Sequence, residues 1–132
     1  MKRQRREYRA NAGTTCEPQS ATTAADATID AAAQSLLARG VKSVLVTLGA
    51  AGCTLYRAGE PPHGLPGRRM TVVDTIGAGD TFTGALAAAM ARAAPLREAM
   101  RWANAAAALS VTGRGAIGGM PSRAQVEALM AE

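Results

Sequence analysis

Aromatic residues are nearly missing from this 132-residue chain. They make up 3% of the sequence, whereas hydrophobic residues of all kinds make up 48%. A core built from this sequence must therefore consist mainly of Ala, Val, Leu and Met side chains. The length leaves room for one domain, which would bury about two-thirds of the surface of the unfolded chain.

Long apolar runs and cysteines are scarce as well. No apolar run reaches the roughly 18 residues that a membrane-spanning helix needs. The start, MKRQRR, is basic and lacks the apolar stretch of a secretory signal peptide. Cys16 and Cys53 have no metal-ligand spacing, which favours reduced thiols without a chemical role. We therefore expect a cytoplasmic protein with no membrane partner.

The net charge of +5 is unevenly distributed. Five of the fifteen basic residues lie within the first ten positions, and the remainder of the chain is close to neutral. Such a basic arm can touch phosphate backbones non-specifically, but it is more often a solvated tail. We expect no specific nucleic-acid partner. Residues 1–27 show neither helical nor strand periodicity, which predicts a disordered or unrelated segment.

From Thr28 onward the pattern becomes regular. Apolar residues at helical spacing predict an amphipathic helix that ends at Gly40. Two short apolar runs, 44–48 and 53–56, predict strands joined by a turn at 49–52, and the first is typical of a buried parallel strand. A third strand is expected at 70–73. The expected inward residues of the helix are Ile29, Ala32, Ala33, Leu36 and Leu37.

The second half of the chain is predicted to be mostly helical. One helix should begin near Gly79, run to Arg92 and be buried, because it is apolar on nearly every face. Another should run from Pro95 to about Val111, followed by a loop over 112–119. The sequence from Ser122 to Gln125 is a capping box that begins a last helix. This order suits the end of a layered α/β domain.

The segment from Asp74 to Phe82, DTIGAGDTF, carries the chemistry. Glycines between a strand end and a helix start let backbone N–H groups approach an anion, which the helix N-terminus favours. A carboxylate such as Asp80 at that place can accept a proton from a hydroxyl that attacks a phosphoryl group. It can also simply cap its helix. Asp74 can bind a cation or orient the loop.

Four motifs in order resemble the ribokinase-like (phosphofructokinase-B-type) carbohydrate kinases. Residues 74–80, read as D-T-x-G-A-G-D, resemble the second signature of that family. Residues 46–52 resemble its strand and turn beside the nucleotide phosphates, and 101–116 its adenine-side helix with the cation loop. Residues 121–127 resemble its closing helix. Because the match covers about 28–132, the resemblance implies the C-terminal portion of a ribokinase-like layered α/β/α domain.

The resemblance also implies roles for individual residues. Asp80 would be the catalytic base and would contact the hydroxyl of the sugar substrate. The anion hole for the transferred phosphoryl group would be Gly77, Ala78 and Gly79. Residues beside ATP would be Thr47, Leu48, Gly49, Ala50, Ala51 and Gly52, again Gly79, and Asn104 next to the adenine.

The same resemblance implies two cations. Mg²⁺ would arrive with ATP, held largely by phosphate oxygens and water. A monovalent cation, usually potassium in this family, would lie beside the anion hole. Its ligands would come from Asp74, Ile76, Ser110, Gly113 and Gly115, with Gly119 nearby, where the family commonly has Ser.

The sugar-gripping N-terminal half of the family and its β-stranded lid, through which full-length members often dimerise, have no counterpart in this sequence. We therefore expect a truncated kinase part, with ribose as the best guess for its acceptor, that is inactive alone. Two other interpretations stay open. The chain could be a non-catalytic nucleotide-binding remnant, or a nucleic-acid-binding module that uses its basic start.

Overall fold

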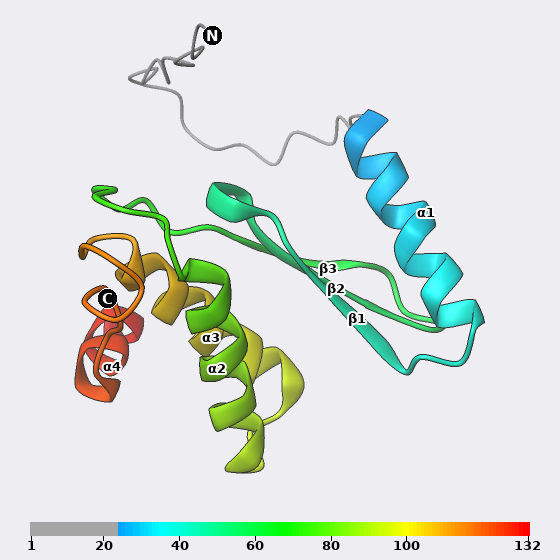
Figure 1. Ribbon diagram of the computed structural model, residues 1–132. Coiled ribbons are helices and arrows are strands. Elements are labelled where there is room, and N and C mark those ends of the chain that lie inside the picture. Colours follow the sequence, from blue (N-terminus) through cyan, green and yellow to red (C-terminus); the bar gives the residue numbers. More distant parts are fainter. Residues whose placement is uncertain (1–23) are drawn as a thin grey trace, which may run out of the picture.

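A computed structural model describes residues 24–132 of the chain (Figure 1). Residues 1–23, with Cys16 and most of the segment expected to be disordered, lie outside the described part. The first helix already begins at Ala24, ahead of the expected start at Thr28. The elements are α1 (Ala24–Ala38), β1 (Ser43–Thr47), a 3₁₀ turn (Gly49–Ala51), β2 (Gly52–Arg57), β3 (His63–Pro66), α2 (Ala78–Ala91), α3 (Leu96–Ser110) and α4 (Arg123–Ala131).

The three strands form one antiparallel sheet in the order β1-β2-β3. Leu45 of β1 pairs with Leu55 of β2. The two predicted strands 44–48 and 53–56 are thus confirmed, but the expectation that the first is a parallel strand is wrong. The short turn at 49–52 leaves no room for a crossover, so the chain returns directly beside itself.

Helices cover the sheet on both faces, as the alternation of side chains along β2 requires. Cys53 and Leu55 point to one face, where they pack with Phe82 of α2 and Met100 of α3. Tyr56 points to the other face and packs with α1. The layers are therefore α1, the sheet, and the pair α2 and α3 (Figure 1). This arrangement confirms the expected layered α/β/α class.

Helix α1 is held to the sheet by a polar contact as well as by packing. Ala33 and Leu37 are buried against Tyr56 as predicted, whereas Ala32 is exposed and Leu36 remains 42% exposed. The hydroxyl of Tyr56 donates a 2.5 Å hydrogen bond to Asp30. Burial, followed by this contact with Asp30, raises the pKa of Tyr56 to about 12. The phenol therefore stays protonated and remains a donor throughout the neutral range.

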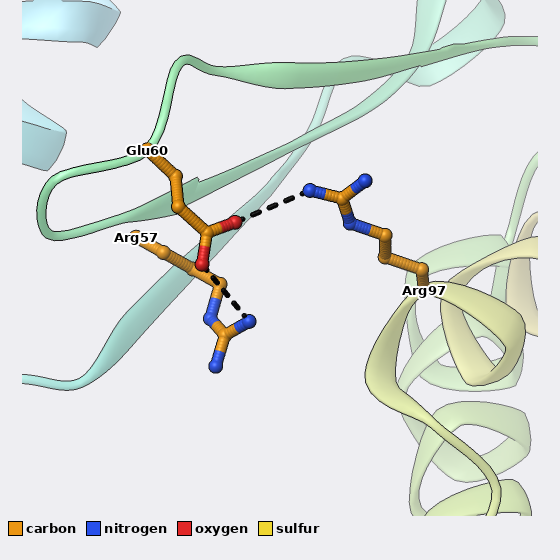
Figure 2. Close-up of polar contacts among 3 residues, drawn as sticks. All are labelled: Arg57, Glu60 and Arg97. Atoms are coloured by element: carbon orange, nitrogen blue, oxygen red, sulfur yellow. Dashed lines mark hydrogen bonds and ion pairs between the residues drawn. The ribbon is translucent and has the colours of Figure 1, made fainter.

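An ion triad ties the far end of the sheet to α3. Glu60, in the turn between β2 and β3, contacts Arg57 and Arg97, each at 3.2 Å (Figure 2). All three side chains are at least 39% exposed. Exposed pairs of this kind contribute about 0–1 kcal/mol each. The triad thus orients the hairpin more than it stabilises the fold.

The predicted third strand at 70–73 is wrong. The third strand is instead His63–Pro66, and the segment before Asp74 runs toward α3, where the N–H groups of Val73 and Asp74 both donate to the carbonyl of Val111. Val73 is 54% exposed. The segment 70–73 therefore has no neighbouring strand to pair with, and tertiary contacts override its strand propensity.

The helices of the second half begin and end close to their predicted limits. However, α2 is not buried on every side, since only Thr81, Phe82 and Ala89 are buried and Met90 is 50% exposed. Within the described residues its neighbours cover only one face. The loop at 112–119 and the capping box are confirmed, with hydrogen bonds in both directions between Ser122 and Gln125.

No helix within residues 24–132 is long and apolar enough to cross a bilayer.

Candidate active site

The chain enters α2 through a left-handed glycine. Gly77 is the N-cap of α2 and has φ of +81°, a conformation that costs other residues roughly 1–2 kcal/mol. A Cβ here would also lie 2.8 Å from the Cβ of Ala116. Glycine therefore lets this turn close against the later glycine-rich loop. The first N–H groups of a helix have no carbonyl partner within it, and that of Ala78 donates to the carbonyl of Thr75 at 3.3 Å.

Asp80 is the third residue of α2 and is exposed. The N-cap position belongs to Gly77, which forms no side-chain capping bond. Within the described residues, the carboxylate of Asp80 takes part in no hydrogen bond or ion pair. Its carboxylate therefore stands uncommitted beside the anion-favouring end of the helix, which is the position that a proton acceptor needs.

Asp74 joins the turn to the glycine-rich loop. One carboxylate oxygen accepts the N–H of Ile76 at 3.0 Å, and the other accepts the N–H of Gly115 at 2.9 Å. The bond from Ile76, then that from Gly115, lower the pKa of Asp74, and a bond from Thr75 and the charge of Arg114 add to this against the opposing effect of desolvation. Asp74 is therefore ionised and acts as a bracket between two segments 41 residues apart.

The two hydrogen bonds that Asp74 accepts from Ile76 and Gly115 should be lost in acid. Because the pKa of Asp74 in the folded chain lies below its ordinary value of 3.8, its stabilising effect is complete above 3.8 and is lost as the pH falls through the lower folded value. We expect the amide NMR signals of Ile76 and Gly115 to shift together, with a shared midpoint below 3.8. The variant Asp74→Asn should show no such titration. A midpoint at or above 3.8 would contradict the bracket.

The loop at 113–119 brings backbone carbonyls together. Gly119 is buried, and a Cβ on it would overlap the carbonyl oxygen of Ser110 and lie 3.1 Å from that of Gly115. Gly113 is packed equally tightly, since a Cβ there would lie 2.7 Å from the Cα of Gly119. Two carbonyl oxygens thus converge beside Gly119, and the serine common in the family would not fit this backbone. The four glycines of the loop, at 113, 115, 118 and 119, permit this folding.

Carbonyl oxygens with one carboxylate suit a hard monovalent cation better than a transition metal. Ser110, Gly113, Gly115 and Gly119 lie together, and Asp74 reaches them through Gly115. Within residues 24–132, no three His, Cys, Asp or Glu side chains form a metal cluster. The residues therefore fit a potassium-like ion held by backbone oxygens.

The turn at residues 48–52 is packed against the end of β3. The N–H of Leu48 donates to the carbonyl of Gly52 at 2.7 Å, which closes the turn. Gly52 has φ of +100°, and a Cβ on it would overlap the carbonyl of Leu65. The N–H of Gly67 donates to the carbonyl of Ala51 at 3.2 Å. The turn thus depends on the segment 65–67, which the sequence analysis did not include in the site.

Asn104 approaches the same segment from α3. Its side chain is 8% exposed, and its Nδ2 donates to the carbonyl of Pro66 at 2.9 Å. Asn104 and Ser110 lie six residues apart on α3, which corresponds to about 9 Å along a helix. One helix therefore carries both the support of the 48–52 turn and the carbonyl loop, and it brings the predicted site residues into one region.

The residues matched by a known family include all of these site residues. The sequence profile of the pfkB family carbohydrate kinases matches residues 6–123. The chain belongs to the pfkB family of carbohydrate kinases. The match begins at residue 6, ahead of the boundary expected near residue 28.

Relatives within the pfkB family include a ribokinase of Arabidopsis thaliana, which is 48% identical over 94 residues, 69% of this chain and 24% of that protein. The structure of ribokinase from Thermotoga maritima matches with a TM-score of 0.76 and 39% identity, over 79% of this chain and 35% of the other. The chain thus spans about a quarter to a third of these relatives, and its fold is part of the ribokinase-like α/β fold.

Two solved structures from the family were determined with ligands. Arabidopsis thaliana ribokinase complexed with ribose and ATP matches with a TM-score of 0.74 and 44% identity, over 79% of this chain and 34% of the other. Phosphofructokinase-2 of Escherichia coli in complex with potassium matches with a TM-score of 0.70 and 26% identity, over 83% and 34%. These ligands are properties of those two proteins.

A cavity of about 290 Å³ opens beside Asp80 between α2, α3 and α4. Asp80 is one of its lining residues, but no residue of the carbonyl loop or of the 48–52 turn is, so only Asp80 connects this cavity with the predicted site. Thr81 lines it, is 7% exposed, and has a hydroxyl without a hydrogen-bond partner among the described residues. The other lining residues are Gly84, Ala85, Ala88, Arg92, Trp102, Ala106, Met120, Pro121, Arg123 and Val126.

The buried, unpaired hydroxyl of Thr81 should destabilise the fold. Thr81→Val keeps the shape and removes the unpaired group, and we expect the free energy of unfolding to rise by about 1 kcal/mol. Urea unfolding measures this difference. Thr83→Val is the matched control, because the Thr83 hydroxyl donates to Gly79 at 3.0 Å and its loss should lower stability. A Thr81→Val variant less stable than the parent chain would show that the hydroxyl has a partner.

Proposed function

We propose that this chain is the nucleotide-binding and catalytic part of a kinase that transfers the γ-phosphoryl group of ATP to a sugar hydroxyl. The observation that supports this most is the uncommitted carboxylate of Asp80 beside the helix entrance formed by Gly77. Membership of the pfkB family supports the class of reaction.

In this proposal Asp80 takes the proton of the acceptor hydroxyl while the oxygen attacks the γ-phosphorus. The bond from that phosphorus to the bridging oxygen breaks, and ADP leaves. The N–H groups at Gly77, Ala78 and Gly79 stabilise the charge on the transferring group, where one placed donor contributes about 3–4 kcal/mol. The proton, the phosphoryl group and the leaving oxygen are thus all accounted for.

Residues 47–52 line the ATP phosphates in this proposal, and Asn104 stands on the adenine side. The cation ligands are Asp74, the carbonyls of Ile76, Ser110, Gly113 and Gly115, and the backbone beside Gly119. Mg²⁺ would arrive with ATP and would supply neutralisation of phosphate charge, and a potassium-like ion held by these ligands would add positive charge beside the turn. The E. coli relative in complex with potassium supports this assignment.

Ribose is the proposed acceptor, because the Arabidopsis relative was solved with ribose and ATP. We expect no turnover from the 132-residue chain alone. Asp80 is exposed, and phosphoryl transfer depends on positioning and exclusion of water.

We also propose a cytoplasmic location, no specific nucleic-acid partner, and residues 28–132 as the functional unit. Dimerisation through a lid stays a prediction from the family.

A chimera tests the proposal. The ribokinase of Arabidopsis thaliana would carry residues 28–132 of this chain in place of its own matching segment, and ADP formation would be followed with ATP and ribose. We expect ribose-dependent turnover that rises with potassium. A folded chimera that binds ATP without turnover would favour the non-catalytic remnant instead. The purified 132-residue chain is assayed in parallel, and ribose-dependent ADP release from it would contradict the expected inactivity.

A further inference from the structure

The amide nitrogen of the Asn104 side chain already has a partner within the fold. Asn104 is 8% exposed on a helix whose other buried residues nearby are Met100 and alanines, and its Nδ2 donates to the carbonyl of Pro66 at 2.9 Å. A buried amide needs such a partner, because leaving it unpaired costs about 1–3 kcal/mol. The bond therefore fixes where the end of β3 lies relative to α3.

The end of β3 in turn determines the position of the 48–52 turn. Gly52 pairs with Pro66, and the ideal Cβ of Gly52 would lie 2.5 Å from the N of Gly67. A Cβ on Gly67 would overlap the carbonyl of Ala50. Backbones this close cannot move separately, so a shift of the Pro66 carbonyl passes directly to the turn.

We infer that Asn104 is a positioning residue for the phosphate-lining turn, acting through Pro66 and Gly67. This inference rests on the proposed function. It assigns the segment 66–67 to the nucleotide site as the link between α3 and the turn.

The first measurement is hydrogen exchange of the free chain, which needs no ligand. Asn104→Leu keeps nearly the same side-chain size and removes the donor without adding a charge, and Asn104→Ala removes the side chain. We expect the amides of Leu48 and Gly67 to exchange about 2- to 10-fold faster in both variants, the factor that one lost hydrogen bond corresponds to. Amides in α1 should not change. Equal acceleration over the whole chain would overturn the inference, since it would show a general loss of stability.

Glu60→Gln is the matched control. Glu60 contacts α3 from the opposite end of the same hairpin, through Arg97 (Figure 2). Its loss should leave exchange at Leu48 and Gly67 unchanged. If Glu60→Gln accelerated these amides as much as the Asn104 variants do, the specific role of Asn104 would be refuted.

The second measurement separates positioning from base contact. Calorimetry would compare ATP, adenosine and inorganic tripolyphosphate on the parent chain and on Asn104→Leu. Positioning predicts that affinity for ATP and for tripolyphosphate falls by the same factor while adenosine binding is unchanged. Loss for ATP and adenosine with unchanged tripolyphosphate binding would overturn the inference. If the parent chain binds none of the three, the proposed nucleotide site fails, and hydrogen exchange still decides the role of Asn104.

Discussion

Replacing Asp80 by Asn in the ribokinase chimera is expected to lower turnover by about 10²–10⁴-fold, the usual contribution of a positioned proton acceptor. The amide keeps the shape of the side chain but cannot take the hydroxyl proton. Asp80 has no partner among the described residues, so its neutralisation leaves no buried group unpaired. The loss should therefore appear in kcat, with the affinity for ATP retained or slightly improved by removal of a negative charge.

The control for this variant is another exposed carboxylate. Glu127 of α4 pairs with Arg123 at 2.7 Å on the surface, and Glu127→Gln removes the same charge away from the turn. Its kcat should stay within a factor of two or so of the parent, since exposed pairs contribute about 0–1 kcal/mol. Asp80→Asn turnover equal to that of the parent chimera would exclude Asp80 as the base and favour a capping or purely electrostatic role.

The second large effect is expected from Met100→Ala, which should lower the free energy of unfolding by about 2–5 kcal/mol. Met100 is fully buried, at 0% exposure, between the sheet and α2, in the cluster that contains Cys53 and Phe82. Because aromatics are scarce, few large side chains fill this space, and neighbouring alanines cannot expand into the cavity. The loss is large relative to a total stability of about 5–15 kcal/mol.

Urea unfolding measures the Met100→Ala effect, and Cys53 provides an independent readout. Burial raises the pKa of its thiol to about 11, so the folded chain should react slowly with thiol reagents at neutral pH. In a Cys16→Ser background the reaction of Cys53 reports opening of the core. Met90→Ala, on the half-exposed face of α2, should change both readouts little. Equal effects of the two methionine variants would contradict the assignment of the core.

Local signals in the sequence predicted much of the fold. The hairpin of β1 and β2, the limits of α2 and α3, and the Ser122 capping box all depend on residues close in sequence. β3 was missed because Gly64 and Pro66 weaken a strand pattern, although an edge strand tolerates both. The valines at 72–73 indicated a strand that found no neighbour. Whether each segment became a strand depended on a pairing partner elsewhere in the chain, which β3 has and residues 70–73 lack.

In the candidate site, too, features set by neighbouring residues were predicted, whereas contacts between distant residues were not. The DTIGAGD motif predicted that Asp74, Gly77 and Asp80 would meet at a helix start, because seven consecutive residues determine that turn. The contact of Asn104 with Pro66 spans 38 residues, and no local pattern indicates it. A Pro-Gly pair at 66–67 marks a turn, which was the one available signal. Close backbone approaches, such as that of Gly52 to Leu65, become visible only in three dimensions.

The Asp74 bracket has a consequence for the order of folding. It closes a loop of 41 residues, whereas the β1–β2 hairpin closes within a few residues. Loop-closure entropy delays distant contacts, so the bracket should form only after α2 and α3 have packed, late on the folding pathway. Asp74→Asn would then accelerate unfolding and leave the folding rate nearly unchanged, a low φ-value. The turn at the start of α2 would be the last part of the chain to assemble and the first to open.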